Sequence, residues 1–199
     1  MARTRVFDEQ QVLDRAMALF WRQGFEATSI QDLVEEVGIN RASMYATFGD
    51  KRQLFIAVLD HYLSRVNGER LALLARPGSA VAAIAAFFEA IITASRGAEK
   101  HLGCLVTNTL TELAPSDPEI AAKLRASLGR VESAFAAAIR RGQESNEMAA
   151  DQDACAMARF LVATAQGVRV LARSGATPAT LREIVTVALR ALRWPSSRS

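Results

Sequence analysis

Hydroxyl, guanidinium and ammonium groups recur at short intervals between Arg41 and Lys51, in the stretch RASMYATFGDK. At helical spacing, Met44 and Phe48 share one face of this stretch. The opposite face has only small side chains, those of Ala42, Ser43 and Ala46. Such polar groups bind phosphate oxygens and base edges, and a face of small side chains lets a helix enter the major groove of DNA. We therefore expect one face to pack inward and the other to contact DNA.

Three short helices must position these groups before the chain reaches Asp50. Capping residues and glycine stops predict them over residues 8–24, 28–38 and 40–49. Thr28 and Gln31 form the predicted capping box of the second helix, and Asn40 is the predicted N-cap of the third. Two short helices joined by a glycine turn and braced by an earlier helix are typical of a helix-turn-helix.

The segment from Phe7 to Phe55 resembles the DNA-binding domain of TetR/AcrR-type transcriptional regulators. The resemblance is carried by LFWRQGFEATSIQDLVEEVGINRASMYATFGDKRQLF, in which seven positions fall in register. These positions are Gly24, Thr28, Gly38, Tyr45, Phe48, Lys51 and Leu54. The resemblance implies phosphate contacts from Tyr45, from Lys51 and from the helix start at Thr28 and Ser29.

The same resemblance places Ser43 and Thr47 where family members touch bases or nearby phosphates. Ala46 and Thr47 are smaller than the bulky residues that commonly follow the family's tyrosine, so we expect base readout mainly from Arg41, Ser43 and Thr47. The full set of predicted DNA-binding residues is Thr28, Ser29, Arg41, Ala42, Ser43, Tyr45, Thr47 and Lys51. Arg3 and Arg5 are alternatively a minor-groove arm or a frayed terminus.

Alanine-rich, half-hydrophobic composition predicts an all-α protein of about nine helices. We expect residues 1–52 to form the helix-turn-helix DNA-binding domain and residues 53–199 an effector-binding and dimerisation domain. The segments GCLVTNTLTELA, from Gly103, and QGVRVLARSGATP, from Gln166, resemble a C-terminal domain common in the family.

The resemblance implies that the last two helices pair with their copies in a second subunit. Alternating small and large side chains in the first of these helices favour such close packing, although an ordinary internal core is the alternative. The predicted interface consists of Ala158, Leu161, Ala165, Val168, Leu181, Val185 and Leu189. A two-fold symmetric homodimer predicts a roughly palindromic double-stranded operator.

A pocket for an unknown small-molecule effector is also implied by the resemblance. Candidate lining residues combine aromatic walls with a few polar groups, and plain core packing is the alternative for each aromatic. They are Tyr62, Phe88, Cys104, Thr107, Asn108, Thr111, Phe135 and Gln166. Cys104, near Lys100 and His101 at the start of a helix, is either a reactive thiol that senses oxidants or electrophiles or an inert buried cysteine.

Other functions have less support in the sequence. The chain has only His61 and His101 as histidine bases and lacks G-x-S-x-G, P-loop and Rossmann fingerprints, so we expect neither an enzyme nor a cofactor. Both histidines and the cysteines Cys104 and Cys155 are too scattered to predict a metal site. No apolar run long enough for a membrane span and no signal peptide are apparent, which predicts a cytoplasmic protein.

Net charge gives little guidance about the partner. The chain carries +3 overall, but residues 1–55 hold seven Lys and Arg against eight Asp and Glu. Affinity for DNA must therefore depend on where the cations lie rather than on their number. A helical adaptor that binds no DNA is the remaining alternative.

Overall fold

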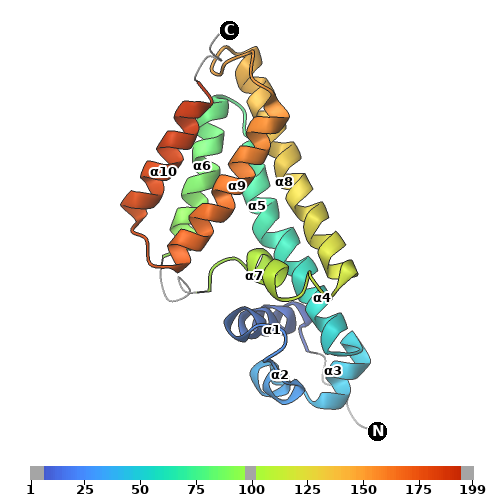
Figure 1. Ribbon diagram of the computed structural model, residues 1–199. Coiled ribbons are helices and arrows are strands. Elements are labelled where there is room, and N and C mark those ends of the chain that lie inside the picture. Colours follow the sequence, from blue (N-terminus) through green and yellow to red (C-terminus); the bar gives the residue numbers. More distant parts are fainter. Residues whose placement is uncertain (1–6, 97–101, 194–199) are drawn as a thin grey trace.

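The computed structural model describes residues 7–96 and 102–193, and within these ranges every regular element is helical (Figure 1). A small group of helices, α1 to α3, forms one end of an elongated molecule, and a longer bundle forms the other. The elements are α1 Glu9–Gln23, α2 Ile30–Val37, α3 Arg41–Phe48, α4 Lys51–Tyr62, the π-helical η1 Leu63–Asn67, α5 Gly68–Leu74, α6 Ala80–Ala94, α7 Leu105–Glu112, α8 Pro118–Glu144, α9 Ala154–Arg173 and α10 Pro178–Ala191.

One rod runs from the helix-turn-helix into the bundle. It consists of α4, the π-helical segment η1 and α5, which follow one another without a break. Counted as one helix, this rod brings the total over the described residues to nine, the number predicted. The π-helical turn within the rod was not predicted from the sequence.

Helix starts are set by side-chain caps. Asn40 caps α3 as predicted, and Asp8 and Asp50 accept backbone N–H groups at the starts of α1 and α4. The predicted capping box of α2 is wrong by one residue. Ser29 is the N-cap: its hydroxyl accepts from Asp32 N at 3.1 Å, and Ser29 N donates to the Asp32 carboxylate at 2.8 Å.

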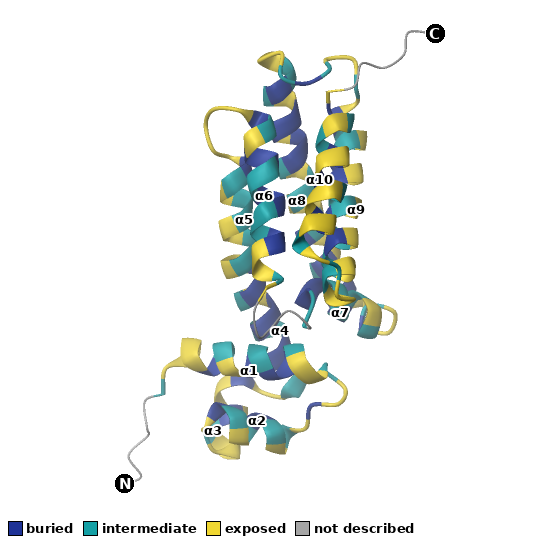
Figure 2. Cartoon of the chain, turned by 90° about the vertical axis from the view of Figure 1, so that its left-hand side faces the viewer, coloured by how far each residue is buried: buried dark blue, intermediate teal, exposed yellow. Residues whose placement is uncertain are grey.

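Two hydrophobic cores lie one above the other along the molecule, and Figure 2 shows the buried faces. The first joins α1–α4 to Cys104, to α7 and to the beginning of α8. The second lies among α6, the later part of α8, α9 and α10. Since the core of the helix-turn-helix extends along α4 to Leu63, it continues beyond the predicted domain boundary at residue 52.

The α9 helix differs from its prediction in two ways. By length and composition alone it is apolar enough to cross a membrane, although no such run was predicted. The predicted dimer residues on this helix face inward instead of outward. The residues buried in the chain's own core are Ala158, Leu161, Ala165 and Val168 on α9 and Leu181 and Val185 on α10, while Leu189 is half-buried.

The outward faces of α9 and α10 are apolar as well. Phe160 is 43% exposed, Val170 54%, Leu171 40% and Val187 65%. Apart from Tyr45, these are the exposed large hydrophobic side chains of the described chain. Because a second subunit cannot contact side chains already covered within the first, an interface on these helices must use this outer face, which we call the α9–α10 apolar face.

Candidate functional site

The turn between α2 and α3 fixes the relative orientation of the two helices. Gly38 adopts the left-handed conformation, with φ of +76°, which side chains with a Cβ rarely adopt. Asn40 then caps α3 by accepting from Ser43 N at 2.8 Å. Met44 and Phe48 anchor α3 in the core as predicted, with 2% and 9% exposure.

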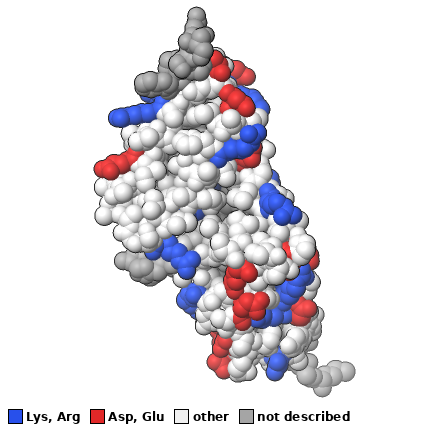
Figure 3. All heavy atoms as spheres, in the orientation of Figure 1, with Lys and Arg blue, Asp and Glu red and all other residues white. Residues whose placement is uncertain are grey.

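The outer face of α3 is open to solvent. Arg41, Ala42, Tyr45, Ala46 and Thr47 are exposed, and Ser43 is half-buried. The Arg41 guanidinium lies over the Tyr45 ring, 5.8 Å from its centroid, which orders both side chains without covering the small residues. Acidic and basic side chains are mixed over the end of the molecule that α1 to α3 form (Figure 3).

Two of the predicted phosphate contacts are already engaged within the chain. Thr28 is fully buried, and its hydroxyl donates to Gly24 O at 2.6 Å. The Lys51 ammonium donates to Phe25 O and Thr28 O, both at 2.9 Å, and lies 4.3 Å from the centroid of the Phe25 ring. Thr28 therefore closes the turn that follows α1, and the exposed Ser29 is the residue of this pair that faces solvent.

Three polar contacts join the helix-turn-helix to α7 and α8. Trp21 Nε1 donates to Leu102 O at 3.1 Å, and Glu26 N donates to the Glu112 carboxylate at 2.9 Å. The Arg52 guanidinium binds Asp117 through Nε at 2.9 Å and Nη2 at 3.0 Å, and Nη2 reaches Glu119 at 2.7 Å. This guanidinium lowers the pKa of the Asp117 carboxyl. The bond from Trp21 to Leu102 ties α1 to the segment that leads into α7, and the bond from Glu26 to Glu112 ties the turn after α1 to the end of α7.

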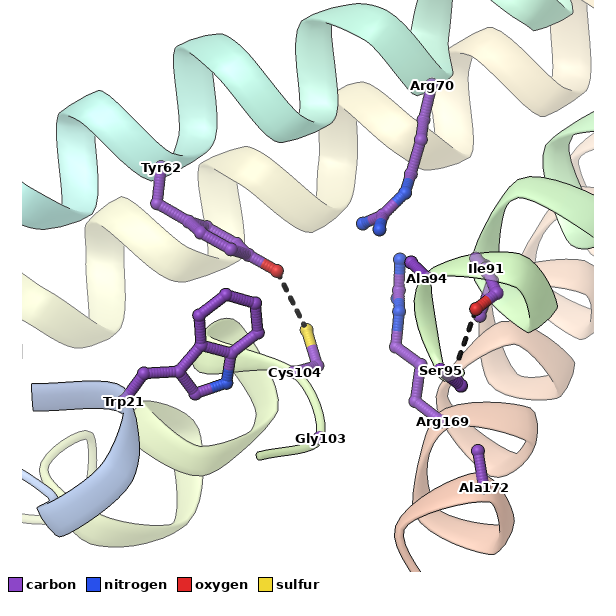
Figure 4. A pocket seen from close by; sticks show the side chains of 10 residues that line it. All are labelled: Trp21, Tyr62, Arg70, Ile91, Ala94, Ser95, Gly103, Cys104, Arg169 and Ala172. Atoms are coloured by element: carbon purple, nitrogen blue, oxygen red, sulfur yellow. Dashed lines mark hydrogen bonds between the residues drawn. The ribbon is translucent and has the colours of Figure 1, made fainter. Parts of the chain in front are cut away.

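A small cavity lies next to the first of these contacts (Figure 4). Its volume is about 40 Å³. Trp21 from α1 and Tyr62 from α4 meet there at 5.3 Å between ring centroids, edge to face, beside Cys104 at the N-cap of α7. The other lining residues are Arg70, Ile91, Ala94, Ser95, Gly103, Arg169 and Ala172.

Cys104 is buried, and its Sγ lies 3.8 Å from the Tyr62 hydroxyl. Burial raises the pKa of the Cys104 thiol, but Arg169 and hydrogen bonds from Thr107 and Tyr62 outweigh this effect and lower the pKa overall. Burial raises the pKa of Tyr62 well above its usual range, so the phenol keeps its proton. Lys100 and His101, the predicted neighbours of the thiol, lie outside the described residues, as do Arg3 and Arg5.

The other predicted pocket residues are dispersed. Thr107 donates to Gln166 at 2.7 Å, beside the cavity, whereas Asn108 and Thr111 face the space between α1 and α7. Phe88 and Phe135 do not line the cavity, because both are fully buried in the second core with ring centroids 6.0 Å apart. The sequence analysis missed Trp21, Arg70 and Arg169 as lining residues, because nothing local in the sequence shows that helices so far apart in the chain meet at one point.

Known proteins resemble the chain over nearly its whole length. Residues 12–58 match the family described as bacterial regulatory proteins, tetR family, and residues 80–188 match a tetracyclin repressor-like C-terminal domain. The HTH-type transcriptional repressor ComR of Escherichia coli (strain K12) is 36% identical over 97% of this chain and 91% of ComR. The chain belongs to the TetR family.

Two other relatives extend the comparison. The HTH-type transcriptional regulator YezE of Bacillus subtilis (strain 168) is 34% identical over 96% of this chain and all of YezE. A cysteine mutant of the TetR family regulator CifR, solved with a 26-bp double-strand operator DNA, is 33% identical with a TM-score of 0.86, over 97% of this chain and 100% of that chain. Membership of the TetR family confirms the predicted all-α fold and the prediction of a DNA-binding transcriptional regulator. These relatives are named as regulators and not as enzymes.

Lys51 provides a test of the TetR family interface. We expect Lys51→Ala to weaken binding to every DNA sequence and to reduce the slope of log affinity against log salt by about 0.9, the value for one phosphate contact. Changes at Ser43 or Thr47 should instead alter sequence preference. Fluorescence anisotropy measures the affinities for operator and random DNA over a salt series. These affinities distinguish the loss of a phosphate contact from a change in base readout. If Lys51→Ala binds DNA more weakly but the salt slope is unchanged, Lys51 does not contact a phosphate and only stabilises the turn from Phe25 to Thr28.

Proposed function

We propose that this TetR family protein is a repressor that binds a palindromic operator as a homodimer and leaves it when a small-molecule effector binds. The observation that carries the proposal is the outer face of α3, where small side chains are flanked by Arg41, Tyr45 and Thr47. The name of ComR as a repressor and the operator bound to CifR support the same role. Binding to chromosomal DNA implies action in the cytoplasm.

The α9–α10 apolar face supports the homodimer. Four large apolar side chains are exposed on it, and the small, exposed Ala163 and Gly167 on α9 allow close approach of a second helix. In the view of Figure 3, the surface over these helices carries few charged side chains. A two-fold pair then presents two copies of α3 to successive turns of the major groove.

The cavity between Trp21, Tyr62 and Cys104 is the proposed effector site. Trp21 belongs to the helix-turn-helix, so a ligand in the cavity contacts the DNA-binding domain directly. The ligand releases DNA only to the extent that it prefers the released conformation. We infer that it alters the contact between Trp21 and Leu102 and thereby the separation of the two α3 helices.

Selection of genomic DNA tests the proposal. Fragments of the source genome are captured with the purified protein at about 150 mM salt in competition with random DNA, and then sequenced. We expect an enriched palindrome whose half-sites are about one helical turn apart or a multiple of it. Recovery of no sequence above background, by a protein that is folded and dimeric, would contradict the proposal and favour the adaptor.

A second candidate function is thiol sensing through Cys104. The position of the Cys104 thiol beside Arg169 in the cavity favours it, because a neighbouring guanidinium stabilises the thiolate, which is the reactive form. In a Cys155→Ser background, we expect Cys104 to react with iodoacetamide faster than a model thiol near neutral pH. Alkylation no faster than the model thiol from about pH 6 to 9 would leave Cys104 as an inert lining residue.

A further inference from the structure

The cavity holds two arginines that have no counter-ion among the residues that the structure describes. Arg70 of α5 and Arg169 of α9 both line it, and their guanidinium groups point into the same space (Figure 4). Within residues 7–96 and 102–193, neither guanidinium forms an ion pair or a hydrogen bond. By contrast, Arg52 and Arg182 each bind a carboxylate through two nitrogens.

Two cations that share a small space repel each other, and partial burial removes the water that would screen them. An anion between them would offset that repulsion. The fork of a guanidinium matches the two oxygens of a carboxylate, which makes paired arginines well suited to bind one. The Tyr62 hydroxyl, protonated and at the same cavity, is a further donor.

Size and lining restrict the ligand further. About 40 Å³ is room for roughly three water molecules, which is the size of one carboxylate group. Apolar atoms of Trp21, Ile91 and Ala172 complete the wall. On the other side of Cys104 and Arg169, a second, smaller cavity of about 10 Å³ is bordered by Leu128, Val131 and Val162. A short apolar part of the ligand would fit into this second cavity if the side chains that border it move apart.

We propose that the effector is a small organic acid whose carboxylate binds between Arg70 and Arg169. Its apolar body lies against Trp21 or extends past Cys104 toward Val131 and Val162. The regulatory role of the acid rests on the proposed function, whereas the binding of the acid does not. Regulation is therefore measured with operator DNA, and acid binding is measured without DNA.

Thermal unfolding without DNA tests the binding. The probes are sodium acetate, butyrate and benzoate, each compared with its neutral amide and with sodium phosphate at constant ionic strength. At 100 times its dissociation constant, a ligand raises the unfolding midpoint of a chain of this size by roughly 5–10 °C. We expect such a shift from butyrate or benzoate and none from the amides. Quenching of tryptophan fluorescence in a Trp194→Phe background, where Trp21 is the remaining tryptophan, provides a second readout.

Variants at the two arginines assign the binding, and a variant at a third arginine is the control. Arg70→Gln and Arg169→Gln should each weaken acid binding by about 10- to 100-fold, the effect of losing one charged hydrogen-bonding partner. Arg125→Gln removes the same charge from an exposed position on α8 and should bind as the wild type does. If Arg169→Gln does not fold, Arg169→Lys keeps the charge without the fork and should give an intermediate loss.

The outcomes are separable. Equal stabilisation of the wild type and of both cavity variants would overturn the proposal, as would stabilisation by phosphate alone or by no probe at tens of millimolar. Acid binding that depends on Arg70 and Arg169 but leaves the operator complex intact would keep the site and contradict the effector mechanism. Failure to bind any operator would contradict the proposed function and leave the acid site standing.

Discussion

Replacing Phe160 with glutamate is expected to convert the protein from a dimer into a monomer and to abolish specific operator binding. Phe160 is 43% exposed within one chain, so the substitution disturbs the fold of the monomer little. In the proposed dimer, the new carboxylate of each subunit would be buried without a partner, which costs several kcal/mol per ion. The free-energy cost of burying two such charges, one from each subunit, is larger than the free energy that the apolar contacts of the interface contribute.

The loss of DNA binding follows from the loss of avidity. A monomer contacts one half-site, and joining two sites in a dimer raises affinity by about 10²- to 10⁴-fold. We therefore expect at least a ~100-fold weaker operator complex. Sedimentation should show the mass falling from twice the chain mass of 21.6 kDa to the chain mass itself. Ala122→Glu, at an exposed position near the start of α8, is the matched control. A dimeric Phe160→Glu variant with full operator affinity would place the interface elsewhere.

Replacing Gly24 with alanine should destabilise the whole N-terminal region. Gly24 has φ of 85° and ψ of 170°, a conformation that is essentially restricted to glycine. A Cβ there would also lie 2.9 Å from the Glu112 carboxylate, which accepts from Glu26 N. Strain and the close contact together predict a free energy of unfolding lower by about 2–4 kcal/mol.

Gly68→Ala is the matched control for this prediction. Gly68 is helical and has open space around its missing Cβ, so alanine there should stabilise the protein by roughly 0.5–1 kcal/mol. Denaturant unfolding at one fixed protein concentration compares the two variants, since a dimer's stability depends on concentration. Adding Glu112→Ala should recover only the part of the loss that comes from the close contact. Equal stabilities of the two variants would mean that the Gly24 turn relaxes without cost.

Local signals predicted the framework of this protein well. Asn40 caps α3 as expected, because a cap depends on residues within one turn of it. The membership of the TetR family and the inward and outward faces of α3 were predicted for the same reason. Ser29 rather than Thr28 is the cap because α2 begins at Ile30, and the Thr28 hydroxyl instead donates to Gly24 O in the preceding turn.

The errors lie where the answer depends on tertiary structure. The α9 helix is apolar on two faces, so periodicity alone did not distinguish the stripe that packs on α8 from the one left exposed. The lining of the cavity beside Trp21 was predicted only in part. Tyr62 and Cys104 line it, but Phe88 and Phe135 fill the core, and Arg169 is more than a hundred positions from Trp21 in sequence.

The π-helical turn at Leu63–Asn67 has a consequence for evolution. A π turn closes its hydrogen bonds around one more residue than an α turn, so this stretch holds an extra residue without interrupting the helix. Relatives that lack this residue would have an uninterrupted α-helix here, with α4 rotated relative to α5. Insertion or deletion of one residue at this point would therefore rotate the helix-turn-helix relative to the C-terminal bundle. The rod offers a natural site for divergence among homologues that keep both cores.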